Sequence, residues 1–215
     1  MNIVFLQFLL GVLFLTIIFL HLSKKNSNSV LAYGLQSLVM ALIMFDSFLV
    51  TPNFQLLLVI MVIVIVKVVL APVFFMKLLK QHQLTFLVNS YLNIPLTLIT
   101  LTVLTAVAHS TKLSPLTTII PNHQSLLALA LAAMLVSVFL IINRKGALSQ
   151  ALGILSLENS LVVFGVFAGL EQSPILQIGV IFDILIWLVI ATVFISMIYK
   201  HFGSLDTSLM KNLRD

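Results

Sequence analysis

Residues 54–79 read FQLLLVIMVIVIVKVVLAPVFFMKLL, an apolar run that carries a charge, Lys67, at its centre. About 18 or more apolar residues are enough to cross a hydrocarbon core about 30 Å thick as an α-helix, at about 1.5 Å per residue. Helices of ordinary soluble proteins are shorter than this and alternate apolar with polar faces. Residues 54–79 therefore predict a membrane-spanning helix.

Similar apolar runs recur along nearly the whole chain. Of its 215 residues, 61% are hydrophobic and 8% are charged, whereas a soluble domain carries about 25% charged residues. Helices are expected, because lipid offers the backbone no hydrogen-bond partners and the runs lack the alternation of a β-barrel strand. The predicted spans are 2–21, 29–50, 54–79, 86–109, 124–143, 148–170 and 174–199. The sequence thus predicts an all-α polytopic membrane helix bundle with about seven transmembrane helices.

The loops between these runs are short, so residues 1–215 are expected to form a single transmembrane domain. Its N-terminal four-helix part is residues 1–109, and its C-terminal three-helix part is residues 124–199. The first run, Ile3–Leu22, follows no basic residue and is too long for the apolar region of a signal peptide, so it is expected to remain as a helix. The chain has no Cys, which excludes disulfides, thiolate metal sites and cysteine catalysis.

The basic loop residues indicate the orientation in the membrane. One side of the predicted spans has Lys24, Lys25, Lys77, Lys80, Arg144, Lys145, Lys200, Lys211 and Arg214, and the other side has Lys112. Because positively charged loops stay in the cytoplasm, the C-terminus is expected to be cytoplasmic and the N-terminus outside. These charges produce the pI near 9.7. They lie singly or in pairs rather than on one phosphate-binding face, so nucleic acid is not an expected partner.

Three charged residues lie well inside the predicted spans, away from the span ends: Lys67, Glu158 and Asp183. Insertion scales give each such residue a cost of about 2.5–3.5 kcal/mol, so charges at this depth usually have a function. Glu158 and Asp183 lie on neighbouring spans joined by a short turn, at depths that differ by about one helical turn, or roughly 6 Å. Carboxyl groups inside a membrane can take up and release protons, and a nearby lysine changes their proton affinity through Coulomb interaction.

A structural interpretation stands beside this functional one, because buried lysine and carboxylate side chains also form ion pairs that hold membrane helices together. Polar side chains expected to bridge helices are Gln36, Asn89, Asn93 and Asn159. Residues expected near the membrane interface are Asp46, Glu171, His109 and His123. The sequence offers no recognisable pair of nucleophile and base and no metal-ligand cluster, so catalysis within this chain is not expected.

The most specific motifs lie toward the C-terminus. They are Glu-Asn-Ser at 158–160, Ile-Gly-Val-Ile-Phe-Asp at 178–183 and Lys-His-Phe-Gly-Ser-Leu-Asp-Thr-Ser-Leu at 200–209. With these motifs, residues 152–215 resemble hydrogenase-4 component E, a membrane subunit of formate-hydrogenlyase-type complexes. Residues 33–39 and 64–76 also fit this family, so the resemblance covers most of the chain.

The resemblance implies a place in a proton-moving assembly. The last three spans of the family are similar to the small K-type subunit of respiratory complex I and to the C-type subunit of multisubunit sodium/proton antiporters. In those proteins, acidic residues on consecutive helices form part of a lateral proton path. Glu158 matches the first of these carboxylates, and Asp183 matches the second, as Asp where complex I has Glu. The resemblance implies no cofactor in this subunit and partners among the other membrane subunits of the complex.

These features together predict a multi-pass, non-catalytic subunit of an oxidoreductase-type complex in the bacterial inner membrane, moving protons or alternatively Na⁺. The residues expected to carry the ion are Glu158, Asp183 and Lys67, with Gln36 and Asn159 as supporting polar groups. Two alternatives stay open: a structural or assembly subunit of such a complex, and a stand-alone cation/proton transporter. The soluble module that drives the complex, the number of copies and the contact between Lys67 and Glu158 are also open at this stage.

Overall fold

The computed structural model describes residues 3–81, 89–170, 173, 179–180 and 193. Within these residues the regular structure is helical, and the β-structure is limited to isolated bridge residues at Lys25, Ser90, Arg144 and Gly146. Most of the seventh predicted span, 174–199, lies outside the described residues, and with it Asp183; Glu171 lies outside them too.

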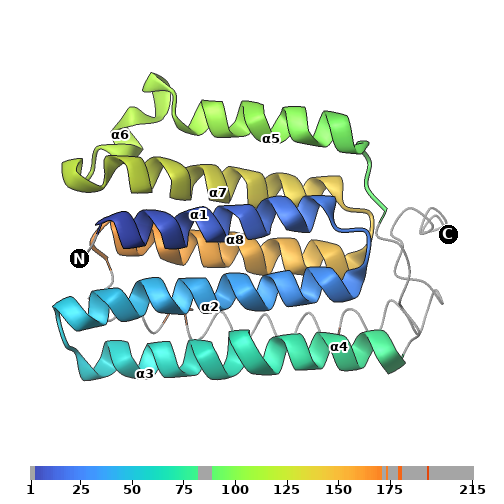
Figure 1. Ribbon diagram of the computed structural model, residues 1–215, viewed down its shortest axis with the longest axis horizontal. Coiled ribbons are helices and arrows are strands. Elements are labelled where there is room, and N and C mark those ends of the chain that lie inside the picture. The colour runs from blue at the N-terminus through green and yellow to red at the C-terminus, as the bar shows by residue number, and fades with distance from the viewer. Residues whose placement is uncertain (1–2, 82–88, 171–172, 174–178, 181–192, 194–215) are drawn as a thin grey trace, which may run out of the picture.

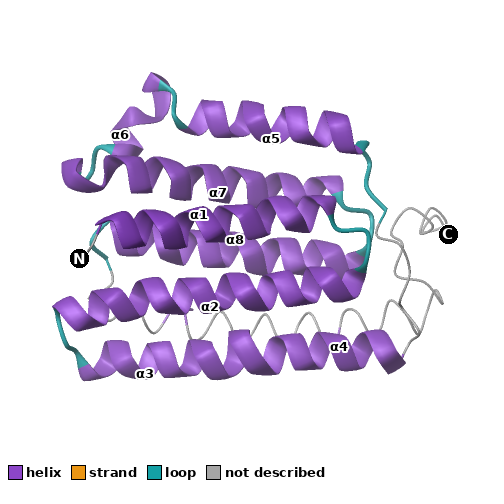
Figure 2. Cartoon of the chain, viewed as in Figure 1, coloured by secondary structure: helices purple, strands orange, loops and turns teal. Residues whose placement is uncertain are grey.

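Long helices run side by side through the described chain (Figures 1 and 2). In chain order the elements are α1 (Ile3–Leu22), α2 (Asn26–Val50), α3 (Phe54–Ile63), η1 (Val64–Leu70), α4 (Ala71–Gln81), α5 (Ile94–Ala108), η2 (Thr111–Leu113), α6 (Ser114–Thr117), η3 (Pro121–His123), α7 (Gln124–Asn143) and α8 (Ala147–Phe167). Element η1 is a π-helix, and η2 and η3 are 3₁₀ helices. The elements α3, η1 and α4 follow one another without a break and are called the α3–α4 rod.

A ring of helices forms the centre of the bundle. Helix α1 packs on α2, α2 on α8, α8 on α7, and α7 on α1. Buried aliphatic side chains such as Leu10, Ile17, Met40 and Leu127 fill the ring. The α3–α4 rod packs on α2, and α5 packs on α7, on opposite sides of the ring (Figure 1). The core therefore combines hairpins from the two ends of the described chain.

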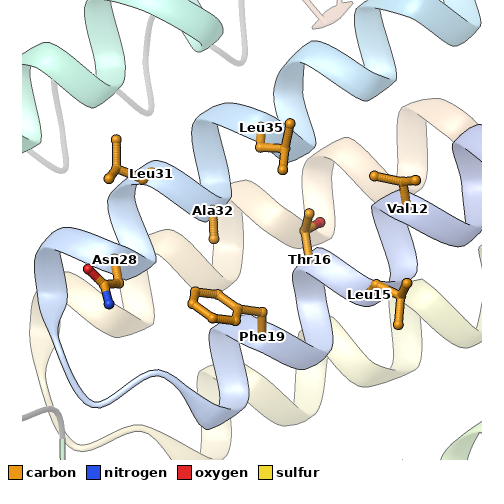
Figure 3. Close-up of a pocket in the computed structure, with 8 residues that line it drawn as sticks. All are labelled: Val12, Leu15, Thr16, Phe19, Asn28, Leu31, Ala32 and Leu35. Atoms are coloured by element: carbon orange, nitrogen blue, oxygen red, sulfur yellow. The ribbon is translucent and has the colours of Figure 1, made fainter.

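Most of these helices are long and apolar enough to cross a membrane. Five pass this test by length and composition: Ile3–Leu22, Asn26–Val50, Phe54–Lys77, Pro121–Asn143 and Ala147–Phe167. Large hydrophobic side chains are exposed on their outer faces, and an apolar groove of about 500 Å³ lies between α1 and α2 (Figure 3). Such a surface suits lipid or another membrane helix rather than water. The chain is thus a multi-pass membrane protein.

The fourth predicted span, 86–109, begins later in the structure than expected. Helix α5 starts at Ile94, because Asn93 caps it by accepting a hydrogen bond from the Leu96 N–H at 3.0 Å. The prediction that Asn93 bridges helices was therefore wrong. Helix α5 has 15 residues, which at about 1.5 Å each span about 22 Å, less than the hydrocarbon core. It forms a sixth crossing only together with Thr111–Thr117, to which it is bent by 52°.

One end of the bundle carries most of the described basic residues. The α1–α2 turn, the end of α4 and the α7–α8 turn meet at this end, which we call the basic end (Figure 1). It carries Lys24, Lys25, Lys77, Lys80, Arg144 and Lys145. Lys112 belongs to η2, next to α6 at the opposite end. The structure thus places the basic loops at one end of the bundle, as the sequence predicts. That this end faces the cytoplasm stays a prediction.

Arg144 closes the C-terminal end of α1. It is 2% exposed, and its Nη2 donates to the carbonyl oxygens of Leu20, His21 and Ser23. Carbonyls in the last turn of a helix lack intrahelical donors, and a cation at this end also interacts favourably with the helix dipole. Burial lowers the pKa of Arg144 to about 10, which leaves the guanidinium charged at neutral pH. Arg144 is therefore a buried cap rather than a solvated loop charge.

We expect Arg144→Ala to lower the free energy of unfolding by about 1.5–3 kcal/mol, because buried carbonyls lose a charged hydrogen-bond donor. Lys24→Ala changes an exposed residue at the same end and is the matched control, with an expected change below about 0.5 kcal/mol. Thermal unfolding of the purified chain in detergent measures both. Equal effects of the two substitutions would contradict the capping role of Arg144.

Candidate functional site

The mid-membrane lysine enters the bundle from the α3–α4 rod. Lys67 lies in the middle of η1 and is completely buried, whereas Ile65 and Val69 are exposed on the outer face of the rod. Both η1 and α4 pack on α2. Lys67 therefore directs its side chain into the bundle and away from lipid, as expected from the cost of a charge in hydrocarbon.

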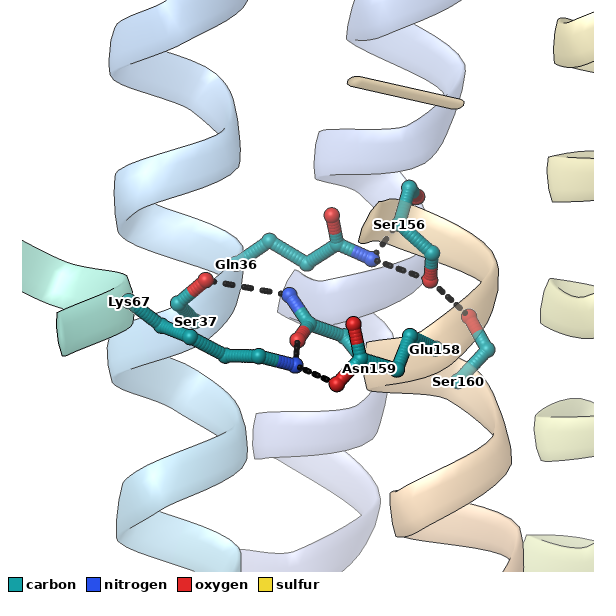
Figure 4. Close-up of polar contacts among 7 residues, drawn as sticks. All are labelled: Gln36, Ser37, Lys67, Ser156, Glu158, Asn159 and Ser160. Atoms are coloured by element: carbon teal, nitrogen blue, oxygen red, sulfur yellow. Dashed lines mark hydrogen bonds and ion pairs between the residues drawn. The ribbon is translucent and has the colours of Figure 1, made fainter. Parts of the chain in front are cut away.

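Lys67 reaches α8 and forms an ion pair there (Figure 4). Its Nζ lies 2.7 Å from Glu158 Oε1 and donates a hydrogen bond to Asn159 Oδ1 at 2.9 Å. Glu158 is 7% exposed and Asn159 is fully buried. Two opposite charges in contact, with a hydrogen bond to the cation, offset part of the desolvation cost that each would incur alone. Lys67 therefore faces Glu158 across the bundle.

Hydrogen bonds extend from this ion pair across the bundle. Asn159 Nδ2 donates to Ser37 Oγ on α2 at 3.0 Å. Gln36, the residue before Ser37, donates from Nε2 to Ser156 Oγ on α8 at 2.9 Å. The same Ser156 oxygen lies 3.1 Å from Ser137 Oγ on α7. The bonds connect three helices of the central ring.

We call this set the polar layer: Gln36, Ser37, Lys67, Ser137, Ser156, Glu158 and Asn159. It links η1, α2, α8 and α7, and it runs across the helix axes rather than along them (Figure 4). Buried polar groups are costly in apolar surroundings unless they bond to one another. A layer of this extent therefore indicates either a function or a strict requirement for one arrangement of helices.

Other buried polar atoms lie within the polar layer and next to it. Gln36 Oε1 is buried without a hydrogen-bond partner in the described part of the chain. Tyr33 is fully buried and lies about one helical turn before Ser37 on α2. Buried polar groups of this kind usually bind ordered water, and one water is enough to pass a proton between side chains. The polar layer thus provides acceptors and donors next to its ion pair.

The structure brings together Lys67, Glu158, Gln36 and Asn159, all of which the sequence singled out. Gln36 and Asn159 bridge helices, as predicted. Asp183, the other carboxyl group of the predicted path, lies outside the described residues. Within the described residues, Glu158 is therefore the carboxyl group of the site.

Sequence reasoning missed the serines of the polar layer: Ser37, Ser137 and Ser156. Serine is common in membrane helices, where it mostly allows close packing, so its presence alone carries little information. Spacing is more informative, because Ser156, Asn159 and Ser160 recur at intervals of three and four residues and so share one face of α8. A polar stripe on an otherwise apolar helix could have indicated this face.

Of the residues expected at the interface, the structure describes His109, His123 and Asp46, and these three do not join the polar layer. Nδ1 of His109 lies 2.8 Å from the Thr105 carbonyl oxygen, and Nδ1 of His123 lies 3.1 Å from that of Phe167. Asp46 is in the last turns of α2, far from the basic end, and its Oδ2 is buried with no hydrogen-bond partner among the residues described. Across residues 3–81 and 89–170, no three His, Cys, Asp or Glu side chains group as a metal site would require.

Comparison of the chain with protein-family models, with curated proteins and with solved structures finds no match. A functional conclusion therefore depends on the residues and their geometry. At the level that the structure shows, the chain is a multi-pass membrane protein with a lysine–glutamate ion pair buried inside its helix bundle.

Proposed function

We propose that this protein is a membrane subunit of an ion-translocating complex, and that its polar layer is a segment of a lateral proton path. The observation that carries the proposal is the buried contact of 2.7 Å between Lys67 Nζ and Glu158 Oε1. The proton occupancy of such a pair depends on both groups together and on the charges around them. A charge that arrives next to the pair changes its occupancy, and charge can move along the membrane plane in this way.

The depth of the ion pair supports this role. Lys67 lies near the middle of the apolar segment Phe54–Lys77, and Glu158 lies near the middle of Ala147–Phe167. Both charges are therefore close to the membrane midplane, about 15 Å from either edge of the hydrocarbon core. A residue whose task was to anchor a helix at the interface would lie nearer to a helix end.

Apolar packing beside the polar layer favours sideways movement of the proton. On α2, the residues that follow Ser37 toward Val50 include Met40, Ile43 and Met44, which are fully buried and apolar. A proton in the polar layer would have to cross this apolar core to reach the surface at that end. Passage to a neighbouring membrane protein avoids the barrier, which favours a subunit of a complex over a stand-alone transporter.

The motifs at 158–160 and 178–183 resemble hydrogenase-4 component E and support a complex of the hydrogenase-4 or complex I-like type. In that setting Asp183 is the second carboxyl group of the path, and antiporter-like membrane subunits are the neighbours. The basic end faces the cytoplasm of a bacterial inner membrane. The proton is the proposed ion, because the charge of Lys67 would repel a sodium ion at Glu158.

The competing interpretation is that the ion pair has a purely structural role. The direct contact between Lys67 and Glu158 favours this interpretation. Lys67 and Glu158 could serve only to hold the α3–α4 rod against α8. A variant that loses both charges separates the two interpretations. A structural role is satisfied by neutral side chains of similar size, whereas a proton path needs the carboxyl group.

Affinity purification of the tagged full chain from its native membrane, in a mild detergent, should recover integral membrane partners in a fixed ratio. The expectation follows from the outer faces of the helices, which expose large hydrophobic side chains suited to other membrane helices. Partner composition is measured by mass spectrometry, with Lys67→Met/Glu158→Gln, which leaves no buried charge uncompensated, as a control that should recover the same partners. A folded chain that elutes alone would contradict the proposed complex.

A further inference from the structure

The π-helix η1 interrupts an otherwise α-helical rod at the position of Lys67. At its end, the Ala71 N–H donates to the carbonyl of Val66, whereas an α-helix would pair it with the carbonyl of residue 67. π-helical turns are rare, and departures from the α-helical pattern have local causes such as proline. The cause of η1 should therefore lie close to Ala71.

Pro72 directly follows Ala71 and supplies that cause. Proline has no N–H to donate, and in an α-helix its ring collides with the carbonyl four residues earlier, here that of Val68. A wider π-helical turn moves this carbonyl away from the ring, and membrane helices commonly accommodate proline through such local adjustments. Pro72 thus explains both the presence and the place of η1.

Gly34 on α2 allows Pro72 to pack closely against α2. A Cβ on Gly34 would lie 3.1 Å from Pro72 Cγ, so a larger residue would push the two helices apart. Ser37, about one turn further along α2, accepts a hydrogen bond from Asn159, which in turn accepts one from Lys67. The same stretch of α2 therefore contacts both the proline and the polar partner of the lysine.

The π-helical turn decides which residue of the rod faces α8. Suppose that 64–70 were α-helical and that α4 kept its place. Each residue before Ala71 would then shift by one position toward the N-terminus, into the place now held by the residue before it. One position corresponds to about 100° around a helix with about 3.6 residues per turn. Lys67 would take the place now held by Val66 and turn away from Glu158, and position 68 would take the place of the lysine.

We infer that Pro72 is the positioning residue that keeps Lys67 in contact with Glu158. It acts through the helical register of the α3–α4 rod. Its consequence for proton transport rests on the proposed function, whereas its consequence for the geometry is independent of that function and can be measured on the purified chain.

The test moves the lysine by one residue, with and without the proline. In the wild-type background, Lys67→Val combined with Val68→Lys should lose the ion pair and lower the unfolding temperature of the full chain in detergent. In the Pro72→Ala background the same exchange should raise the unfolding temperature, because the lysine then reaches Glu158 from position 68. Adding Glu158→Gln to each variant shows which lysine position is coupled to the carboxylate. A lysine that remains coupled from position 67 after Pro72→Ala would overturn the inference.

Gly34→Ala gives a second test that keeps the proline, and it decides the matter if Pro72→Ala does not fold. The added methyl group presses on Pro72, so the coupling between Lys67 and Glu158 should weaken and the unfolding temperature should fall. Gly11→Ala is the matched control, because a Cβ there meets nothing within 4 Å. Equal coupling in the two alanine variants would count against the inference.

Proton pumping by the assembled complex separates this inference from the proposed function. Loss of pumping in Pro72→Ala, with recovery when the lysine is moved to position 68, supports both. Recovery of the ion pair without recovery of pumping would keep the positioning role and count against the role of Lys67 in transport.

Discussion

Lys67→Met is expected to lower the free energy of unfolding by about 3–5 kcal/mol, because it leaves the carboxylate of Glu158 buried without its cation. The two groups are 2.7 Å apart, and the lysine is completely buried. The hydrogen bond from Lys67 to Asn159 is lost as well. Methionine is similar in length and flexible enough to fill the space, so the change reports mainly on the charge.

The matched control is the double variant Lys67→Met/Glu158→Gln, which leaves no buried charge uncompensated. Its stability should return to within about 1 kcal/mol of the wild type, since neutral replacement of a whole buried pair is often tolerated. Thermal unfolding of the four chains of this double-mutant cycle gives the coupling energy directly. A double variant whose loss of stability equals the sum of the losses of the two single variants would mean that the two side chains are not coupled.

Glu158→Gln is expected to reduce proton translocation by the assembled complex about tenfold or more, because glutamine keeps the shape of the side chain but cannot bind and release a proton. Acidification of vesicles that contain the complex, followed with a pH-sensitive dye, measures the rate. Asp183→Asn should have a similar effect if Asp183 is the second carboxyl group of the path. Assembly of each variant is checked by recovery of the same partners.

Two controls show whether the effect belongs to the proton path. Glu158→Asp keeps a carboxyl group and should retain part of the activity. Asp46→Asn removes a carboxylate outside the polar layer, whose Oδ2 is buried near the far end of α2, and should pump normally. Equal losses in Asp46→Asn and Glu158→Gln would point to a general effect of charge removal.

The membrane architecture could be predicted from sequence because lipid leaves the backbone few alternatives to the helix. Five predicted spans coincide with long apolar helices of the structure. The start of the fourth span was missed because apolar composition does not report helix caps, and Asn93 decides where α5 begins. Arg144 was expected to be a loop charge, yet it is buried over the end of α1.

The members of the candidate site were easier to predict than their contacts. Lys67 and Glu158 stand out because a charge in mid-membrane is costly. Their pairing leaves no local signal, since the two residues are far apart in the chain and the direction of Lys67 depends on the register of η1. Pro72 carries that information, but proline in an apolar run is usually taken only as a kink.

Proton pumping by the assembled complex that carries Lys67→Met/Glu158→Gln tests the proposed proton path most directly. This variant lacks the carboxyl group that the proton path requires. It also leaves no buried charge uncompensated, so a loss of pumping would not be caused by a loss of stability. We predict normal assembly with the same partners and loss of pumping. Pumping at the wild-type rate in the assembled double variant would contradict the proton path and leave the polar layer as a structural element that holds the helices together.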